Sequence, residues 1–157
     1  MKTAVRKYEF TGETKTLCDG TVLHRIRALI DIYLGWKFVE SGELGGWVEK
    51  EDNLSHIGNC WVYGNAKVYG NAKVYGDAEV YGYAEVRGNA EVCGNAEVYG
   101  YADVYGNAEV CGNAEVCGYV KVYGDTKISG GAIVCGINHI ADDACGSWYM
   151  KRFTEIK

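Results

Sequence analysis

Residues 58–75 read Gly-Asn-Cys-Trp-Val-Tyr, Gly-Asn-Ala-Lys-Val-Tyr and Gly-Asn-Ala-Lys-Val-Tyr, and this period of six residues continues to residue 135. Thirteen hexads built on the pattern Gly-(Asn/Asp/Tyr)-Ala-x-Val-x follow one another from Gly58 without an insertion. A short fixed period is the signature of a solenoid, in which each repeat stacks on its neighbours. The pattern therefore predicts an all-β fold, a parallel β-helix, over residues 58–135.

Each hexad contains the signals of one short strand and one bend. Strand alternation places Ala66 and Val68 on one side and Lys67 and Tyr69 on the other. Gly70 then supplies the bend, because glycine tolerates a positive φ. One hexad cannot bury its apolar face alone, whereas stacked hexads can. We therefore expect triangular coils of three hexads, stacked about 4.8 Å apart.

The second position of the hexad supports this coil length. It is Asn or Asp in most hexads, but it is Tyr at Tyr83, Tyr101 and Tyr119, which are eighteen residues apart. A triangular coil of three hexads places these three tyrosines on one corner of consecutive coils.

The outward residues sort by the same period into three columns. They are Lys67, Glu85, Asp103 and Lys121; Lys73, Glu91, Glu109 and Lys127; and Trp61, Glu79, Glu97, Glu115 and Ile133. Lysines flank the acids of the first two columns, whereas the glutamates of the third column have no basic neighbour along the stack. Like charges on adjacent strands repel each other. The third column is either a solvated acidic face or a face that is contacted by a neighbouring subunit, a terminal segment or a cationic ligand.

The hexads resemble those of the hexapeptide-repeat, left-handed β-helix superfamily, over about half of the chain. Within it they are most similar to short solenoid proteins of phages and gut bacteria with Tyr-Gly-Asn-Ala-Lys-Val repeats. The stretches 44–49 (Leu-Gly-Gly-Trp-Val-Glu) and 53–56 (Asn-Leu-Ser-His) resemble the segment that leads into the repeats of that group. The resemblance implies a left-handed coil and a parallel homotrimer. It leaves the function open, because one scaffold serves acyltransferases, carbonic anhydrases and non-enzymatic proteins.

Three regions follow from this pattern: an N-terminal β-hairpin appendage and cap (1–57), the repeats (58–135) and a C-terminal capping segment (136–157). In the first region we expect turns at Thr11-Gly12-Glu13 and at Cys18-Asp19-Gly20-Thr21, a long strand over 22–32 and a loop over 35–46. Trp47 and Leu54 are expected to cap the solenoid. In the last region Asp142-Asp143 predicts a turn. Residues 147–157 are expected to be a strand or a short helix, packed through Trp148 and Phe153.

Charge and hydropathy narrow the classes of partner. The chain of 157 residues has 16 basic and 21 acidic side chains and a net charge of −5. No basic stripe is present to neutralise phosphates, which disfavours nucleic-acid binding. No apolar run approaches the roughly 18 residues of a membrane span, and the first residues do not resemble a signal peptide. We therefore expect a cytoplasmic protein.

The seven cysteines lack zinc-finger spacing. Stacking instead pairs Cys93 with Cys111 and Cys117 with Cys135, at a separation that permits a disulfide. Because a reducing cytoplasm is expected, these cysteines are predicted to be free thiols. Neither a metal site nor a cofactor is predicted.

The three histidines are the candidates for a general base if the protein is an enzyme. In acyltransferases of the superfamily a histidine acts as general base for an acyl-CoA substrate, and here the hexads contain no histidine. His56 and His139 lie at the two ends of the repeats and are the candidate bases of such an enzyme. His24 lies in the appendage.

The outward aromatic residues favour binding rather than catalysis. Arg87, the one arginine of the repeats, stands in a column with Tyr105, beside the corner of Tyr83, Tyr101 and Tyr119. Tyrosines suit interfaces and planar ligands, and an arginine can hold a phosphate with two hydrogen bonds. We therefore expect a non-enzymatic trimer that sequesters a nucleotide-type molecule between subunits, by analogy as a phage or prophage anti-defence protein. The alternatives are a hexapeptide acyltransferase and a purely structural module; stacked tyrosines would also serve a strand ladder alone.

Overall fold

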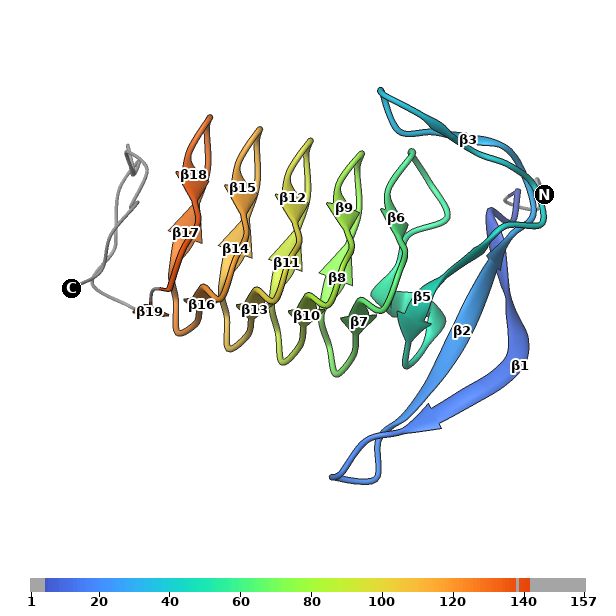
Figure 1. Cartoon of the computed structure of the whole chain (residues 1–157), viewed down its shortest axis with the longest axis horizontal. Helices are drawn as coiled ribbons and strands as arrows, with labels where there is room; N and C mark the ends of the chain where they lie inside the picture. Colours follow the sequence, from blue (N-terminus) through green and yellow to red (C-terminus); the bar gives the residue numbers. More distant parts are fainter. Residues whose placement is uncertain (1–4, 138, 142–157) are drawn as a thin grey trace.

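A computed structural model describes residues 5–137 and 139–141 of the chain (Figure 1). The expected turn at Asp142-Asp143 and the expected packing of Trp148 and Phe153 lie outside these residues. Among the described residues no helix is long and apolar enough to cross a membrane.

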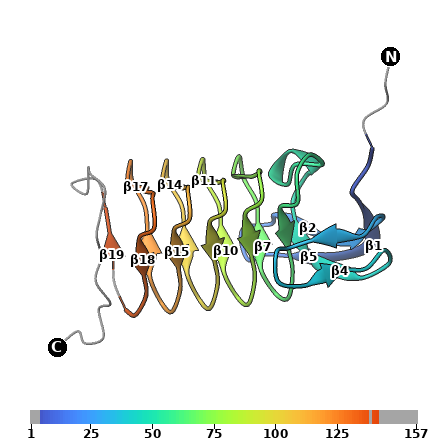
Figure 2. The same cartoon turned by 90° about the horizontal axis from the view of Figure 1, so that it is seen from above.

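The hexads form the three sides of a parallel β-solenoid (Figures 1 and 2). One side contains β7 (Lys67–Val68), β10 (Glu85–Val86), β13 (Asp103–Val104), β16 (Lys121–Val122) and β19 (His139–Ile140). The second contains β8 (Lys73–Val74), β11 (Glu91–Val92), β14 (Glu109–Val110) and β17 (Lys127–Ile128). The third contains β6 (Trp61–Val62), β9 (Glu79–Val80), β12 (Glu97–Val98), β15 (Glu115–Val116) and β18 (Ile133–Val134). Glu85 pairs with Asp103 in register, so the predicted parallel solenoid with eighteen residues per coil is confirmed.

The interior of the solenoid is filled by the small and branched residues of the hexads. Ala66, Val68, Ala84 and Val86 are all fully buried, and the same holds along the stack. The bends stack as closely as the strands. At Gly94, with a φ of 65°, a Cβ atom would lie 2.9 Å from the backbone nitrogen of Gly112. Glycine is therefore required there by both its conformation and its contact.

The N-terminal region extends the first side of the solenoid. β1 (Tyr8–Thr16) pairs antiparallel with β2 (Val22–Ala28), β2 pairs antiparallel with β5 (Leu44–Val48), and β5 lies parallel to β7. The parallel ladder thus reaches N-terminal of the hexads. The hairpin at Cys18–Thr21 is confirmed by the Leu17 N–H donating to the Thr21 carbonyl at 2.8 Å.

Two of the expected connections in this region are wrong. Gly12 does not form a hairpin turn; it lies inside β1, where a bulge between Phe10 and Thr14 absorbs its φ of 94°. The segment 35–46 is not a plain loop. It contains β4 (Phe38–Val39), paired with β3 (Ile32–Tyr33), and the start of β5. The expected strand over 22–32 is accordingly split, because β2 ends at Ala28 and β3 begins at Ile32.

Buried polar groups close the N-terminal end of the coils. Each coil donates its backbone N–H groups to the carbonyls of the next coil, as Trp61 does to Ala78 at 3.0 Å, so the carbonyls of the first coil need donors from the N-terminal segment. The Trp47 N–H supplies one of them, donating to the Ala66 carbonyl at 3.0 Å. The Lys7 ammonium, on a residue that is 1% exposed, donates to the carbonyl of Cys60 at 2.6 Å and of Gly58 at 3.2 Å. The Asn53 amide, from the 3-10 turn Glu51–Asn53, donates to Ala72 at 2.9 Å. The predicted capping residues Trp47 and Leu54 are buried against this end as part of the ladder.

Candidate functional site

The corner tyrosines form one continuous stack. Tyr83 and Tyr101 have ring centroids 5.0 Å apart, and Tyr101 and Tyr119 are 4.9 Å apart, with nearly parallel planes. Each ring is more than half exposed. The ring faces contact one another at this spacing, so a base cannot enter between two of them, and the column presents ring edges and hydroxyls to solvent.

Arg87 is already paired within the chain. Its Nε and Nη2 donate to the two carboxylate oxygens of Asp103 at 3.1 and 2.8 Å, and its guanidinium lies 4.1 Å from the centroid of the Tyr105 ring. The hydrogen bonds to Asp103 raise the pKa of Arg87 further. The structure therefore brings Arg87 together with Tyr105, as expected, but its fork of donors is taken by a carboxylate rather than left for a phosphate.

His56 is held in a way that disfavours a role as general base. Its ring stacks on Tyr8 at 4.2 Å, and Nδ1 accepts a hydrogen bond from the Lys7 backbone N–H at 3.1 Å. This bond places the proton of the neutral ring on Nε2, which is buried and has no hydrogen-bond partner among the described residues. Burial lowers the pKa of His56. His139 in β19 is exposed, beside Tyr123, and His24 stacks on Phe10.

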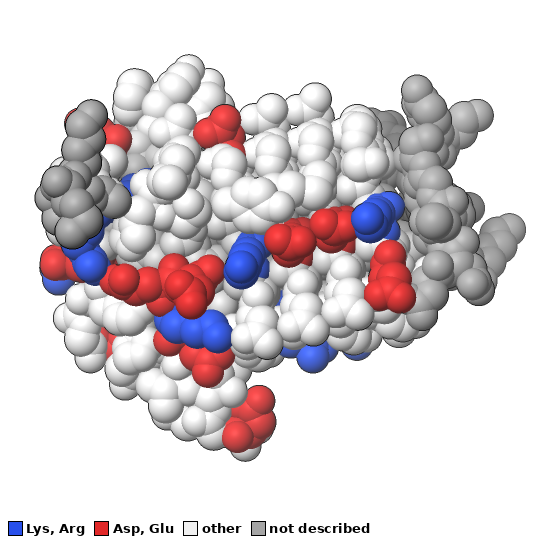
Figure 3. Space-filling view, turned by 180° about the vertical axis from the view of Figure 1, so that it is seen from behind, with Lys and Arg blue, Asp and Glu red and all other residues white. Residues whose placement is uncertain are grey.

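The third column of outward residues is a ladder of carboxylates. Glu97 is in register with Glu79 on one side and with Glu115 on the other. Tyrosine hydroxyls one coil earlier orient two of them: Tyr63 donates to Glu79 at 3.0 Å and Tyr81 to Glu97 at 3.3 Å. Burial, and then the neighbouring Glu115, raise the pKa of Glu97. On the other columns Glu109, Glu85 and Asp103 form ion pairs with Lys127, Lys67 and Arg87, respectively. Figure 3 shows acidic side chains lined up between basic ones along one face.

The hairpin of β3 and β4 reaches over the first carboxylate of this ladder. Trp36 Nε1 donates to Glu79 at 3.4 Å, and Glu79 is only 5% exposed. Burial raises the pKa of Glu79, while the bonds from Tyr63 and Trp36 and the nearby Lys37 act in the opposite direction. A segment of the N-terminal region thus contacts one end of the acidic column, and contact with a terminal segment was one of the expectations for this face.

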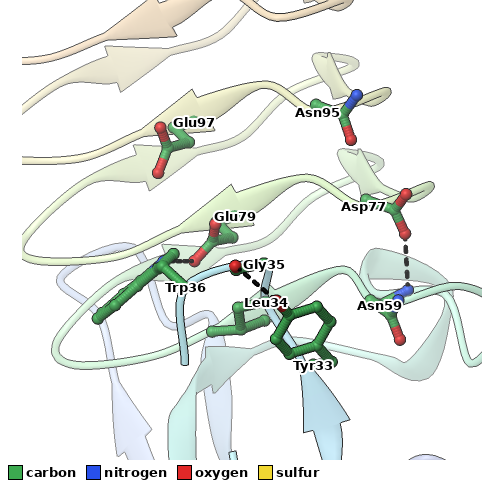
Figure 4. A pocket seen from close by; sticks show the side chains of 9 residues that line it. All are labelled: Tyr33, Leu34, Gly35, Trp36, Asn59, Asp77, Glu79, Asn95 and Glu97. Atoms are coloured by element: carbon green, nitrogen blue, oxygen red, sulfur yellow. Dashed lines mark hydrogen bonds between the residues drawn. The ribbon is translucent and has the colours of Figure 1, made fainter. Parts of the chain in front are cut away.

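A pocket of about 390 Å³ lies between this hairpin and the acidic side of the solenoid (Figure 4). It is lined by Tyr33, Leu34, Gly35, Trp36, Asn59, Asp77, Glu79, Asn95 and Glu97. The lining has three carboxyl groups and two aromatic rings and no basic side chain. The acidic column was visible in the sequence, but Trp36 and Tyr33 were missed, because they stand in a stretch without periodicity and reach Glu79 only through the fold.

An ammonium group of the chain already uses part of this surface. Lys37 Nζ lies 5.5 Å from the centroid of Trp36 and 5.6 Å from that of Tyr63. Aromatic faces attract cations in this geometry. The aromatic rings around Glu79 are therefore placed to accept a positively charged nitrogen.

The cysteines correct one expectation. Cys117 and Cys135 form a disulfide between successive coils, with their Cα atoms 4.6 Å apart, whereas free thiols were expected. The stacked strands bring the two residues within bonding range whatever the compartment. Cys93 and Cys111 are free as predicted, and burial together with Cys93 raises the pKa of Cys111 to about 12. Among the described residues no cluster of three or more His, Cys, Asp or Glu is arranged to hold a metal ion.

Comparison with known proteins does not place the chain in a family: no family model matches it, and the curated proteins contain no match. The function is therefore inferred from the geometry of the site.

Proposed function

We propose that this chain is a non-enzymatic binding protein whose pocket between the β3–β4 hairpin and the acidic side of the solenoid takes a small organic cation. The observation that carries the proposal is the lining itself, in which Asp77, Glu79 and Glu97 face Trp36 and Tyr33 without a basic residue. Carboxylates supply the charge, and aromatic rings accept the apolar body and the cationic head of such a ligand.

Isothermal titration calorimetry of the full chain with alkylammonium and guanidinium compounds tests this function. Trp36→Ala should weaken binding at least tenfold, because it removes the aromatic wall. Phe38→Ala is the matched control, since Phe38 is an equally exposed aromatic residue of the same hairpin, at 61% against 64%, but does not line the pocket. Equal affinities of the two variants, or no binding of any cation, would refute the proposal.

The sequence-based hypothesis of nucleotide sequestration uses a different surface, that of Arg87, Tyr105 and the corner tyrosines. It is supported by the guanidinium lying on an aromatic ring, and it requires a phosphate to replace Asp103 as the partner of Arg87. If nucleotide binding is found and Arg87→Ala leaves it unchanged, that site is wrong. A phage or prophage anti-defence role belongs to this hypothesis.

The left-handed coil and the parallel homotrimer implied by the resemblance belong to the hypothesis of nucleotide sequestration between subunits. Native mass spectrometry of gently purified protein tests the oligomer and its contents together. A trimer carrying a nucleotide would favour sequestration, a trimer carrying CoA would favour the acyltransferase alternative, and a monomer would exclude a site between subunits.

A further inference from the structure

The carboxylates of the proposed cation site continue beyond the pocket at a regular spacing. Glu79 and Glu97 line it, and Glu115 follows in register on β15. Neighbouring strands lie about 4.8 Å apart, so the column presents one carboxylate per coil along the solenoid axis. A ligand with a single positive charge would use only one step of this column.

The orientation of the carboxylates is set by the protein. Tyr63 and Tyr81 donate to Oε1 of Glu79 and of Glu97, respectively, and Trp36 also donates to Oε1 of Glu79. Hydrogen bonds of this kind hold a side chain in one position before a ligand arrives, which reduces the entropy lost on binding. Figure 4 shows Glu79 and Glu97 on neighbouring strands, with Trp36 beside Glu79.

The spacing selects among organic cations. In an extended chain two nitrogens separated by three methylene groups are about 5 Å apart, because four bonds of about 1.5 Å follow a zigzag. That distance matches one coil. The methylene groups between the nitrogens need an apolar surface, and Trp36, Leu34 and Tyr33 supply one in the pocket.

We propose that the ligand is a linear polyamine, whose ammonium groups pair with successive carboxylates of the Glu79–Glu97–Glu115 column while its methylene chain lies against Trp36. This inference rests on the proposed function, because it names the class of cation that the pocket takes. The end of the ligand under the hairpin would occupy the surface that Lys37 borders, and the other end would reach toward Glu115.

Isothermal titration calorimetry with the full chain, using spermidine and propylamine as probes, tests the inference. We expect spermidine to bind at least tenfold more tightly than propylamine. Glu115→Gln should lower the ratio of spermidine affinity to propylamine affinity several-fold, because only spermidine is long enough to reach Glu115, which lies outside the pocket lining. Glu109→Gln, which removes an acid from a column where Lys127 is its partner, should change neither.

The possible failures are distinguishable. If neither amine binds, the proposed function itself is wrong. If both bind equally, or Glu115→Gln has no effect on spermidine, the pocket binds cations but not along the column. If Mg²⁺ displaces spermidine from the wild type and from Trp36→Ala alike, the acidic face attracts counterions without a specific site, and the inference is overturned.

Discussion

Lys7 shows how a single residue can end a stack of strands. A solenoid of parallel coils exposes a row of unpaired carbonyls at one end, and buried carbonyls without a partner are costly. Here an ammonium group occupies that end, donating to Gly58 and Cys60. Burial lowers the pKa of Lys7, although Cys60 acts in the opposite direction. The residue thus exchanges hydration for hydrogen bonds to two carbonyls, and it is buried together with its apolar stem.

Replacement of this residue should be costly. Lys7→Met keeps the stem but leaves the two carbonyls without a donor, so we expect a loss of about 2 kcal/mol in the free energy of unfolding. Urea denaturation followed by circular dichroism measures it. Lys73→Met is the control, because Lys73 is exposed, and its effect should stay within about 0.5 kcal/mol. Similar urea midpoints for the two variants would contradict the capping role.

In the bends between strands, a matched pair of glycines separates two energetic costs of an added side chain. One is the cost of the left-handed conformation, and the other is the cost of the contact with the next bend. Gly94 and Gly130 have φ values of 65° and 66°. A Cβ at Gly94 would lie 2.9 Å from Gly112 N, whereas at Gly130 it meets no described atom within 4 Å. Both alanine variants lose about 1–2 kcal/mol for the left-handed conformation, and Gly94→Ala should lose more. The difference between their urea midpoints measures the contact of stacked bends, and no difference would show that conformation alone selects glycine.

The acidic ladder should make stability depend on pH. The pKa of Glu97 is raised above its ordinary value of 4.5, first by burial and then by Glu115. Because the folded state favours the protonated form, the contribution of Glu97 to stability is fully present below pH 4.5 and is lost as the pH rises through the raised pKa. Glu97→Gln should therefore stabilise the fold at pH 7 by about 0.5 kcal/mol and make little difference near pH 4. Thermal unfolding at both pH values, without added polyamine, tests this, and an equal effect at the two would contradict it.

For the whole molecule, the disulfide ties the last coils together. Cys117 and Cys135 close a loop with a sequence separation of 18, which by the chain-entropy argument is worth about 3 kcal/mol. A reducing agent should lower the midpoint of thermal unfolding of the wild type and leave Cys117→Ser unaffected. Cys93→Ser should respond like the wild type, since Cys93 is free. An unchanged wild-type midpoint after reduction would mean that stacking alone stabilises this end.

Much of the architecture follows from local sequence alone. The hexad requires alanine and valine inside, a bend at each glycine and three strands per coil, because strand alternation and backbone sterics act over a few residues. The columns of Glu79, Glu97 and Glu115 and of the corner tyrosines follow from the same period, and both stand in the structure as expected.

The site needed the tertiary structure. Trp36 meets Glu79 across 43 residues of sequence, and Lys7 reaches Cys60 across 53. Gly12 lies in a bulge rather than a turn because β2 pairs with β1 on both sides of it. No local sequence signal predicts these contacts. They form because the non-repetitive N-terminal segment packs over the open end of the solenoid and over its acidic face. The period of six therefore determined the scaffold, and long-range packing of the unique N-terminal segment decided where the pocket lies.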